Sequence, residues 1–209
     1  PFRRIGPVKA IRFFVREYTL SGMFILVLLG VWEILVHVLN VAPFILPPPS
    51  QIFAKLFSNY RLLLSHGSVT LVEAIGGFVL GASAGTTCAI AMARSRLIER
   101  MLYPLVISSQ TFPKEALAPL FVIWFGFGLF PKVFIAGLIS FFPVVVNTTR
   151  GLLSVDPLVL DLMHSLSASQ RQIFTKVRLP NAIPYLFAAL KMCITLSVIG
   201  AVVGEFMGA

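Results

Sequence analysis

Residues 161–180, DLMHSLSASQRQIFTKVRLP, form a polar, basic and helix-prone segment between two strongly apolar stretches. Such a composition contributes nothing to burial in a lipid bilayer. Because the segment lies between two strongly apolar stretches, it is expected at a membrane face. The segment is therefore interpreted as a docking surface for a soluble partner.

The composition of the whole chain is that of a membrane protein. Its 209 residues are 57% hydrophobic and only 12% charged, and the mean hydropathy is +0.92. Soluble domains average about 25% charged residues. Several apolar stretches reach the roughly 20 residues that cross the hydrocarbon core as a helix, and they do not alternate as strands do. The sequence predicts an all-α, polytopic membrane helix bundle.

Five membrane spans are predicted, over residues 20–39, 68–93, 101–125, 132–149 and 184–207. The third is expected to be broken by Pro104, Pro113 and Pro119, because each proline removes a backbone hydrogen bond. Residues 50–67 are expected to lie along the membrane interface. A sixth span is expected after Ala209, since the chain looks truncated at both ends.

The basic residues indicate the orientation of the spans. Arg3, Arg4, Lys9, Arg12 and Arg16 precede the first span, three more lie in the loop at 94–100, and four lie between residues 150 and 178. Only Lys55, Arg61 and Lys132 fall in the opposite segments. Basic loops remain on the cytoplasmic side, so the N-terminus and residues 150–181 are expected there. This distribution accounts for the net charge of +9 without nucleic acid.

Small residues in the spans are interpreted as sites of close helix–helix packing. Gly77, Gly81 and Gly85 recur every four residues and share one helix face, where a neighbouring backbone can approach closely. A role in lining a substrate path is the less favoured alternative. Cys88 and Cys193 lie in apolar spans without metal-ligand spacing, so no metal site is predicted.

Two helix starts are predicted inside the polar segment. Asp156 and Pro157 have the residue types of an N-cap and a first helical position. Ser169 and Gln172 form a capping-box pattern. The expected product is two short amphipathic helices joined by a turn at 167–169, with the second ending at Leu179-Pro180. The first would carry one apolar face, made by Leu158, Leu162, Met163 and Leu166; the second would present Ile173, Phe174 and Val177.

This segment resembles the EAA loop of the permease subunits of binding-protein-dependent ABC importers. In that family Glu-Ala-Ala is followed after three residues by Gly, and after nine more by Ile-x-Leu-Pro. Here Asp161 takes the acidic position, Leu162 and Met163 take the positions of the two alanines, and Ser167 takes that of the glycine. The closing Ile-x-Leu-Pro is matched by Val177, Leu179 and Pro180. Further likeness in 118–128 and 199–209 points to the subfamily of nitrate, sulfonate, taurine, bicarbonate and thiamine-precursor permeases.

The resemblance implies a type I importer permease fold, a location in a bacterial inner membrane and a set of partners. The loop would dock on a separate ABC ATPase, which would bind ATP and magnesium, so this chain needs no cofactor. A periplasmic or lipid-anchored binding protein would deliver a small solute to a permease homodimer. The departure at Ser167 matters, because serine costs about 1 kcal/mol in the left-handed conformation that glycine adopts freely.

Polar side chains at membrane depth are the candidates for a translocation path. They are Lys114, Glu115, Asn147 and Glu205, with Glu73 and Lys191 as further polar residues of the spans. Pairing with groups on neighbouring spans is the favoured alternative for them. The histidines are scattered and no phosphate-binding loop or carboxylate pair stands out. No catalytic residue is therefore predicted.

Two other functions remain open from the residues alone. An ion-coupled secondary transporter would carry inverted internal repeats, and none is clear in the sequence. A membrane-embedded enzyme is less favoured, because it would need a nucleophile with its base, or a metal constellation. Dependence of uptake on a partner ATPase separates these classes.

Overall fold

The computed structural model describes the backbone of residues 7–208 and the side chains of residues 18–207. That part of the chain is helical and contains no strand, which confirms the predicted all-α class. It divides into two compact units, residues 1–65 and 66–209. The basic residues predicted to precede the first span, from Arg3 to Arg16, lie outside the described side chains.

The first unit contains α1 (Pro7–Val38) and α2 (Pro49–Ser58). Within α1, Tyr18–Val38 is long and apolar enough to cross a membrane, in agreement with the span predicted at 20–39. The carboxylate of Glu33 accepts hydrogen bonds from the backbone N–H of Ser50 (2.9 Å) and from its hydroxyl (2.7 Å). Glu33 therefore caps the start of α2 from a neighbouring helix.

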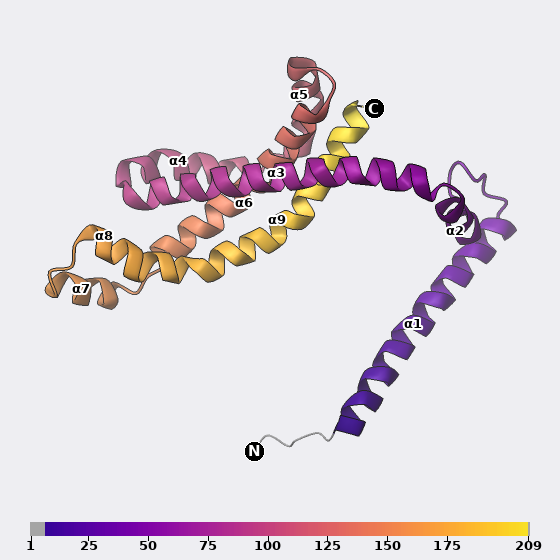
Figure 1. Ribbon diagram of the computed structural model, residues 1–209, viewed down its shortest axis with the longest axis horizontal. Coiled ribbons are helices and arrows are strands. Elements are labelled where there is room, and N and C mark those ends of the chain that lie inside the picture. Colours follow the sequence, from indigo (N-terminus) through magenta and orange to yellow (C-terminus); the bar gives the residue numbers. More distant parts are fainter. Residues whose placement is uncertain (1–6, 209) are drawn as a thin grey trace. The chain divides into compact units, whose positions relative to one another are not determined.

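Three long helices make up most of the second unit (Figure 1). They are α3 (Tyr60–Arg94), which begins in the first unit, α6 (Leu129–Leu153) and α9 (Leu179–Gly208). Each contains a stretch long and apolar enough to cross a membrane, where spans were predicted at 68–93, 132–149 and 184–207. Because α3 already begins at Tyr60, the predicted interfacial segment 50–67 is not one element: it comprises α2 and the first turns of α3.

The glycines of α3 lie directly against α6. A Cβ atom at Gly81 would stand 2.5 Å from the carbonyl oxygen of Gly137, and one at Gly85 would stand 2.9 Å from that of Phe141. A Cβ at Gly77 would overlap Ala136. The two backbones thus pack more closely than any side chain allows, which confirms the packing interpretation.

The third predicted span is divided, but at one place only. It consists of α4 (Arg96–Ser109), the 3₁₀ turn η1 (Lys114–Leu117) and α5 (Ala118–Phe125). The break falls at Pro113. The expectation of breaks at Pro104 and Pro119 was wrong: Pro104 lies inside α4, and Pro119 occupies the first turn of α5, where its missing N–H is not needed.

Hydroxyl groups satisfy carbonyl oxygens where α4 ends. Ser109 Oγ donates to the carbonyl of Val106, and Thr111 Oγ1 donates to that of Ser108, both at 2.7 Å. An interrupted helix is tolerated at membrane depth when its freed backbone groups find such partners. At 14 residues, α4 extends about 21 Å and cannot cross a core of about 30 Å by itself.

Candidate functional site

The predicted docking segment begins as the sequence indicates. Helix α7 (Pro157–Ser165) starts at Pro157, and the Asp156 carboxylate accepts a hydrogen bond from the N–H of Leu158 at 2.9 Å. Asp156 therefore caps the helix, as predicted. The fixed φ of proline and this side-chain bond together set the direction in which α7 leaves the end of α6.

Ser167 adopts the left-handed conformation in which α7 ends. Its φ is 54°. The N–H of Ala168 donates to the carbonyl of Met163 (3.0 Å), and the N–H of Ser167 donates to that of His164 (2.9 Å). These two bonds form a Schellman motif, in which glycine is the usual left-handed residue. The turn thus keeps the geometry expected for the family's glycine, although the residue is serine.

The second helix also begins as predicted, but it does not end where predicted. Ser169 Oγ accepts from the N–H of Gln172 (3.3 Å), and Gln172 Oε1 accepts from the N–H of Ser169 (2.8 Å), so the capping box is confirmed. Helix α8 (Gln170–Ile173) passes through a π turn, η2 (Phe174–Arg178), into α9 without interruption.

The expected helix end at Leu179-Pro180 was therefore wrong, and the π turn supplies the reason. Proline cannot donate a helical hydrogen bond, and its ring clashes with the carbonyl four residues earlier. Here the N–H of Leu179 bonds to Phe174, five residues earlier, which widens the turn just before Pro180. Such single π turns are frequent at functional sites. A continuous helical rod now links the docking segment to a membrane span.

The side chains of the segment divide into an exposed and a buried set. Leu158, Leu162 and Leu166 on the outer side of α7 and its C-cap are 75%, 58% and 69% exposed. By contrast Ile173 is buried, and the other residues of that predicted face, Phe174 and Val177, are half-buried. The exposed apolar surface of the segment therefore comes chiefly from α7. Asp161, Ser167, Leu179 and Pro180 are exposed, and Met163 is half-buried.

The predicted path residues make separate contacts. Glu205 accepts a hydrogen bond from Thr70 Oγ1 at 2.7 Å. The ammonium group of Lys114 stands 5.0 Å from the ring centre of Phe142. Asn147 donates to the carbonyl of Pro143 at 2.9 Å, within its own helix. Glu115 is exposed on η1, next to Lys114. Within the part of the chain that the structure describes, no hydrogen bond or ion pair joins any two of these four residues. The path assignment therefore stays a prediction.

An ion pair between spans confirms for Glu73 the favoured alternative, pairing with a neighbouring span, although its partner was not identified from the sequence. Lys132 Nζ of α6 lies 3.3 Å from Glu73 Oε1 of α3, and the Glu73 side chain is only 1% exposed. Glu73 had been noted as a polar residue of a span, but Lys132 had been assigned to an outer segment. No local pattern connects them, because they are brought together only by the packing of α3 on α6.

Among the described residues, no group of three or more His, Cys, Asp or Glu side chains is arranged to hold a metal ion. Two features of the segment stand out. Helix α7 is apolar, exposed and capped by hydrogen bonds at both ends. The following helix, α8, continues through a π turn into a membrane span. Comparisons with known proteins bear on what such an arrangement serves.

Residues 63–209 match the family model described as binding-protein-dependent transport system inner membrane component. The chain is 36% identical over 188 residues to the formylaminopyrimidine transport permease protein of Halalkalibacterium halodurans. This alignment covers 90% of the present chain and 75% of that protein. The chain is 32% identical over 212 residues to the riboflavin transport system permease protein of Chloroflexus aurantiacus, covering 99% and 78%. It is 30% identical over 184 residues to the taurine transport system permease protein of Escherichia coli, covering 85% and 67%.

The family match covers the docking segment and, from residue 63 onward, the three long helices of the second unit. The chain belongs to the family of binding-protein-dependent transport system inner membrane components and is a permease.

Proposed function

We propose that this permease drives solute import by docking on a separate ATPase through residues 150–181, here called the coupling segment. The observation that carries the proposal is the exposure of Leu158, Leu162 and Leu166 on a helix whose two ends are capped. Exposed leucines at helical spacing fit an apolar groove on a partner. Caps at both ends keep the helix ordered before the partner binds, which lowers the entropic cost of docking.

The connection from α8 to α9 supports a mechanical role for the segment. Helix α7 connects to α8 through the turn at residues 166–169. A displacement of α8 by the ATPase would be transmitted through the π turn into α9, because no loop intervenes between α8 and α9. Helix α9 packs along α6, where Cys193 Sγ donates to the carbonyl of Ser140 at 3.2 Å. The ATPase would thereby shift the balance between two packings of the spans.

The remaining partners follow from the family and the charge distribution. A solute-binding protein delivers the solute, a second permease copy completes the path, and ATP with magnesium binds on the ATPase. The coupling segment and the N-terminus lie on the cytoplasmic side, in keeping with the excess of basic residues in those segments. The relatives named for formylaminopyrimidine, riboflavin and taurine make small organic solutes the class to test, with nitrogen heterocycles first.

Co-purification with the tagged ATPase tests the docking role. The complete chain is expected to be retained, and Leu162→Asp and Leu166→Asp are expected to reduce retention at least about tenfold, since a buried unpaired charge at an interface costs several kcal/mol. Leu97→Asp is the matched control: Leu97 is 69% exposed in α4, outside the coupling segment. Equal retention of all variants would contradict docking through α7.

Uptake into vesicles separates this proposal from an ion-coupled secondary transporter. Import should require the ATPase, enclosed ATP and the binding protein, and it should persist when an ionophore collapses the ion gradients. Uptake that continues without the ATPase and stops with the ionophore would favour the secondary transporter.

A further inference from the structure

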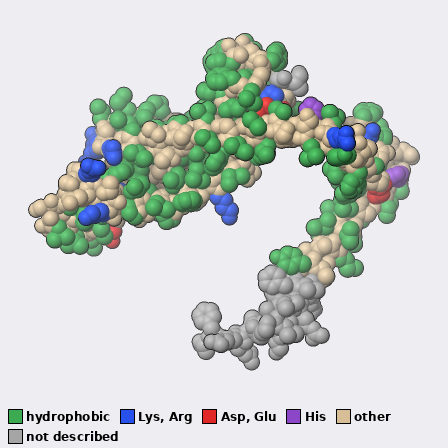
Figure 2. Space-filling view, in the orientation of Figure 1, with side chains coloured by type: hydrophobic (Ala, Val, Ile, Leu, Met, Phe, Trp, Pro, Cys, Tyr) green, Lys and Arg blue, Asp and Glu red, His purple; other side chains and the backbone are tan. Residues whose placement is uncertain are grey.

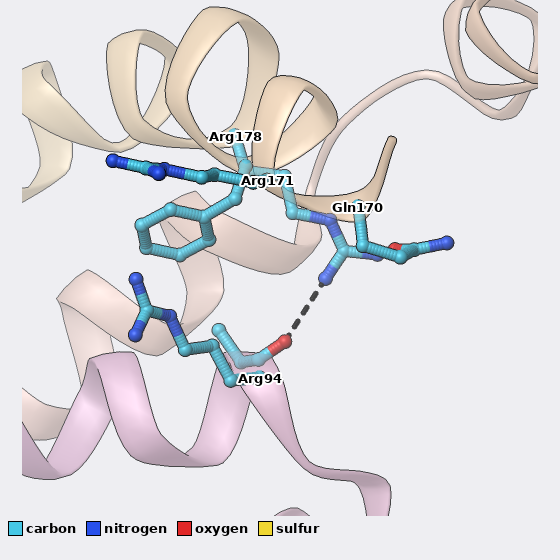
Figure 3. A pocket seen from close by; sticks show the side chains of 6 residues that line it. Arg94, Gln170, Arg171 and Arg178 are labelled. Atoms are coloured by element: carbon cyan, nitrogen blue, oxygen red, sulfur yellow. Dashed lines mark hydrogen bonds between the residues drawn. The ribbon is translucent and has the colours of Figure 1, made fainter. Parts of the chain in front are cut away.

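Arginine side chains surround a hollow between the end of α3 and the start of the α8–α9 rod. The hollow has a volume of about 730 Å³ and is lined by Ala93, Arg94, Gln170, Arg171, Phe174 and Arg178, which we call the arginine pocket (Figure 3). A second hollow of about 620 Å³ shares Arg94 and Arg178 with it and adds Arg96, Arg100 and His164. Figure 2 shows Lys and Arg side chains gathered at this end of the second unit.

Two of the guanidinium groups are held in place by uncharged partners. Arg178 Nη1 donates to the carbonyl of Ala93 at 3.2 Å, and the Arg94 guanidinium stands 4.7 Å from the ring centre of Phe174 (Figure 3). Each contact leaves most of the five N–H donors of an arginine available. The pocket is thus lined by positive groups that are already oriented.

No carboxylate neutralises these arginines within the described part of the chain. The ion pairs found there are His37–Glu33 and Lys132–Glu73, and neither involves the pocket. Glu99 lines the second hollow but lies beyond 4.0 Å of any arginine nitrogen. Several like charges that face one hollow without a counter-charge create a positive potential, which raises the local concentration of anions.

The position of the pocket selects among anions. Arg94 is the last residue of α3, and Arg178 directly precedes α9, so two spans leave the apolar layer here. Phosphate headgroups of the bilayer lie at this level, and basic pockets between membrane helices bind anionic headgroups. Guanidinium groups match phosphate oxygens in bidentate geometry.

We propose that the arginine pocket binds the phosphate group of an anionic phospholipid at the membrane face. The inference goes beyond the proposed function and does not depend on the ATPase; only the assignment of the pocket to the cytoplasmic leaflet follows from the proposed orientation. A lipid bound there would bridge the end of α3 and the α8–α9 rod, because both elements supply arginines.

Native mass spectrometry of the complete chain in detergent tests this site. With added dioleoyl phosphatidylglycerol, the native chain should bind at least about tenfold more tightly than with dioleoyl phosphatidylcholine, since each basic residue contributes about a fivefold gain toward anionic lipid. Arg171→Gln should lower the phosphatidylglycerol affinity about fivefold, and Arg94→Gln with Arg178→Gln about thirtyfold. Arg171 is exposed, and the hydrogen bonds from Thr175 Oγ1 and the N–H of Phe174 are accepted by its backbone carbonyl, so replacing its side chain does not endanger folding.

Arg150→Gln is the matched control, because Arg150 is exposed at the same end of the unit but outside both hollows. An equal loss of affinity in Arg150→Gln and Arg171→Gln would overturn the site in favour of general attraction to charge.

Inorganic phosphate at millimolar concentration should not displace the lipid; displacement would assign the pocket to free phosphate instead. Unchanged lipid binding in the pocket variants, with loss of the ATPase, would assign it to the protein interface.

Discussion

Lys132 of α6 and Glu73 of α3 form an ion pair of 3.3 Å that joins two membrane spans. The Lys132 side chain is 17% exposed and that of Glu73 is 1% exposed. Thr70 of α3 donates a hydrogen bond to Glu205 of α9 at 2.7 Å. Gly204 of α9 also packs directly against Lys132, so the three long helices meet at this point.

Removing Lys132 alone should destabilise the second unit strongly. Lys132→Met leaves the buried Glu73 carboxylate without a cation, which we expect to lower the free energy of unfolding by about 3–5 kcal/mol. The measurement is equilibrium unfolding in mixed micelles with rising dodecyl sulfate. Lys191→Met is the matched control, because Lys191 is exposed on α9.

The double variant Glu73→Leu with Lys132→Met should recover most of that loss, since a buried ion pair replaced by apolar side chains of similar volume is often neutral. A double variant no more stable than Lys132→Met would show that the pair is not coupled. An effect of Lys132→Met below about 1 kcal/mol would place the pair among weak surface contacts.

Close packing of α3 on α6 predicts the effect of a single methyl group. A Cβ at Gly81 would stand 2.5 Å from the Gly137 carbonyl oxygen and 2.8 Å from Ser140 Cβ, so Gly81→Ala must push the helices apart. We expect a loss of about 1–3 kcal/mol in the free energy of unfolding. Gly67→Ala in the same helix is the control: no atom lies within 4 Å of its Cβ position, and alanine there should be neutral or stabilising. Equal behaviour of the two variants would contradict the packing.

The course of the chain through the membrane was largely predictable because span length, prolines and caps are local signals. Four predicted spans coincide with long helices, and Asp156 and Ser169 cap the helices that their spacing indicates. Local reasoning failed at Pro180, where a proline is expected to end a helix. The π turn that accommodates Pro180 depends on the packing of α8 and α9 in the folded chain, and a local sequence pattern does not reveal that packing.

Pairing between spans was expected for the polar residues, but which residues pair could not be predicted, for a different reason. Glu73 and Lys132 belong to separate helices, and no periodicity links them. The arginines of the pocket were noted, but an excess of basic residues at one end of the spans is expected in membrane proteins generally. The excess alone therefore did not indicate that Arg94 and Arg178 line the same hollow.

The cap that Glu33 provides to α2 predicts a local effect in the first unit. Glu33→Ala removes both acceptors of Ser50, so the first turn of α2 should open more often, by about 1 kcal/mol or a fivefold increase in amide exchange. Hydrogen exchange of a peptide covering Ser50 to Phe53 measures this. Ser50→Ala keeps the backbone bond to Glu33 and should show the smaller effect. Exchange in Glu33→Ala equal to that of the native chain would refute the cap.

Ser167 holds a left-handed conformation that serine adopts at a cost of about 1 kcal/mol, and glycine adopts it without that cost. Ser167→Gly should therefore slow amide exchange at the end of α7 about fivefold, while the hydrogen bond from Ala168 to Met163 is retained. The matched control is Ala168→Gly, one residue further, where φ is not positive and the added freedom should speed exchange. Ser167→Val should speed exchange more strongly, because a β-branched side chain is disfavoured at positive φ. If Ser167→Gly exchanged faster than the native chain, the turn would depend on the serine side chain and not on backbone conformation, and its correspondence to the family's glycine would fail.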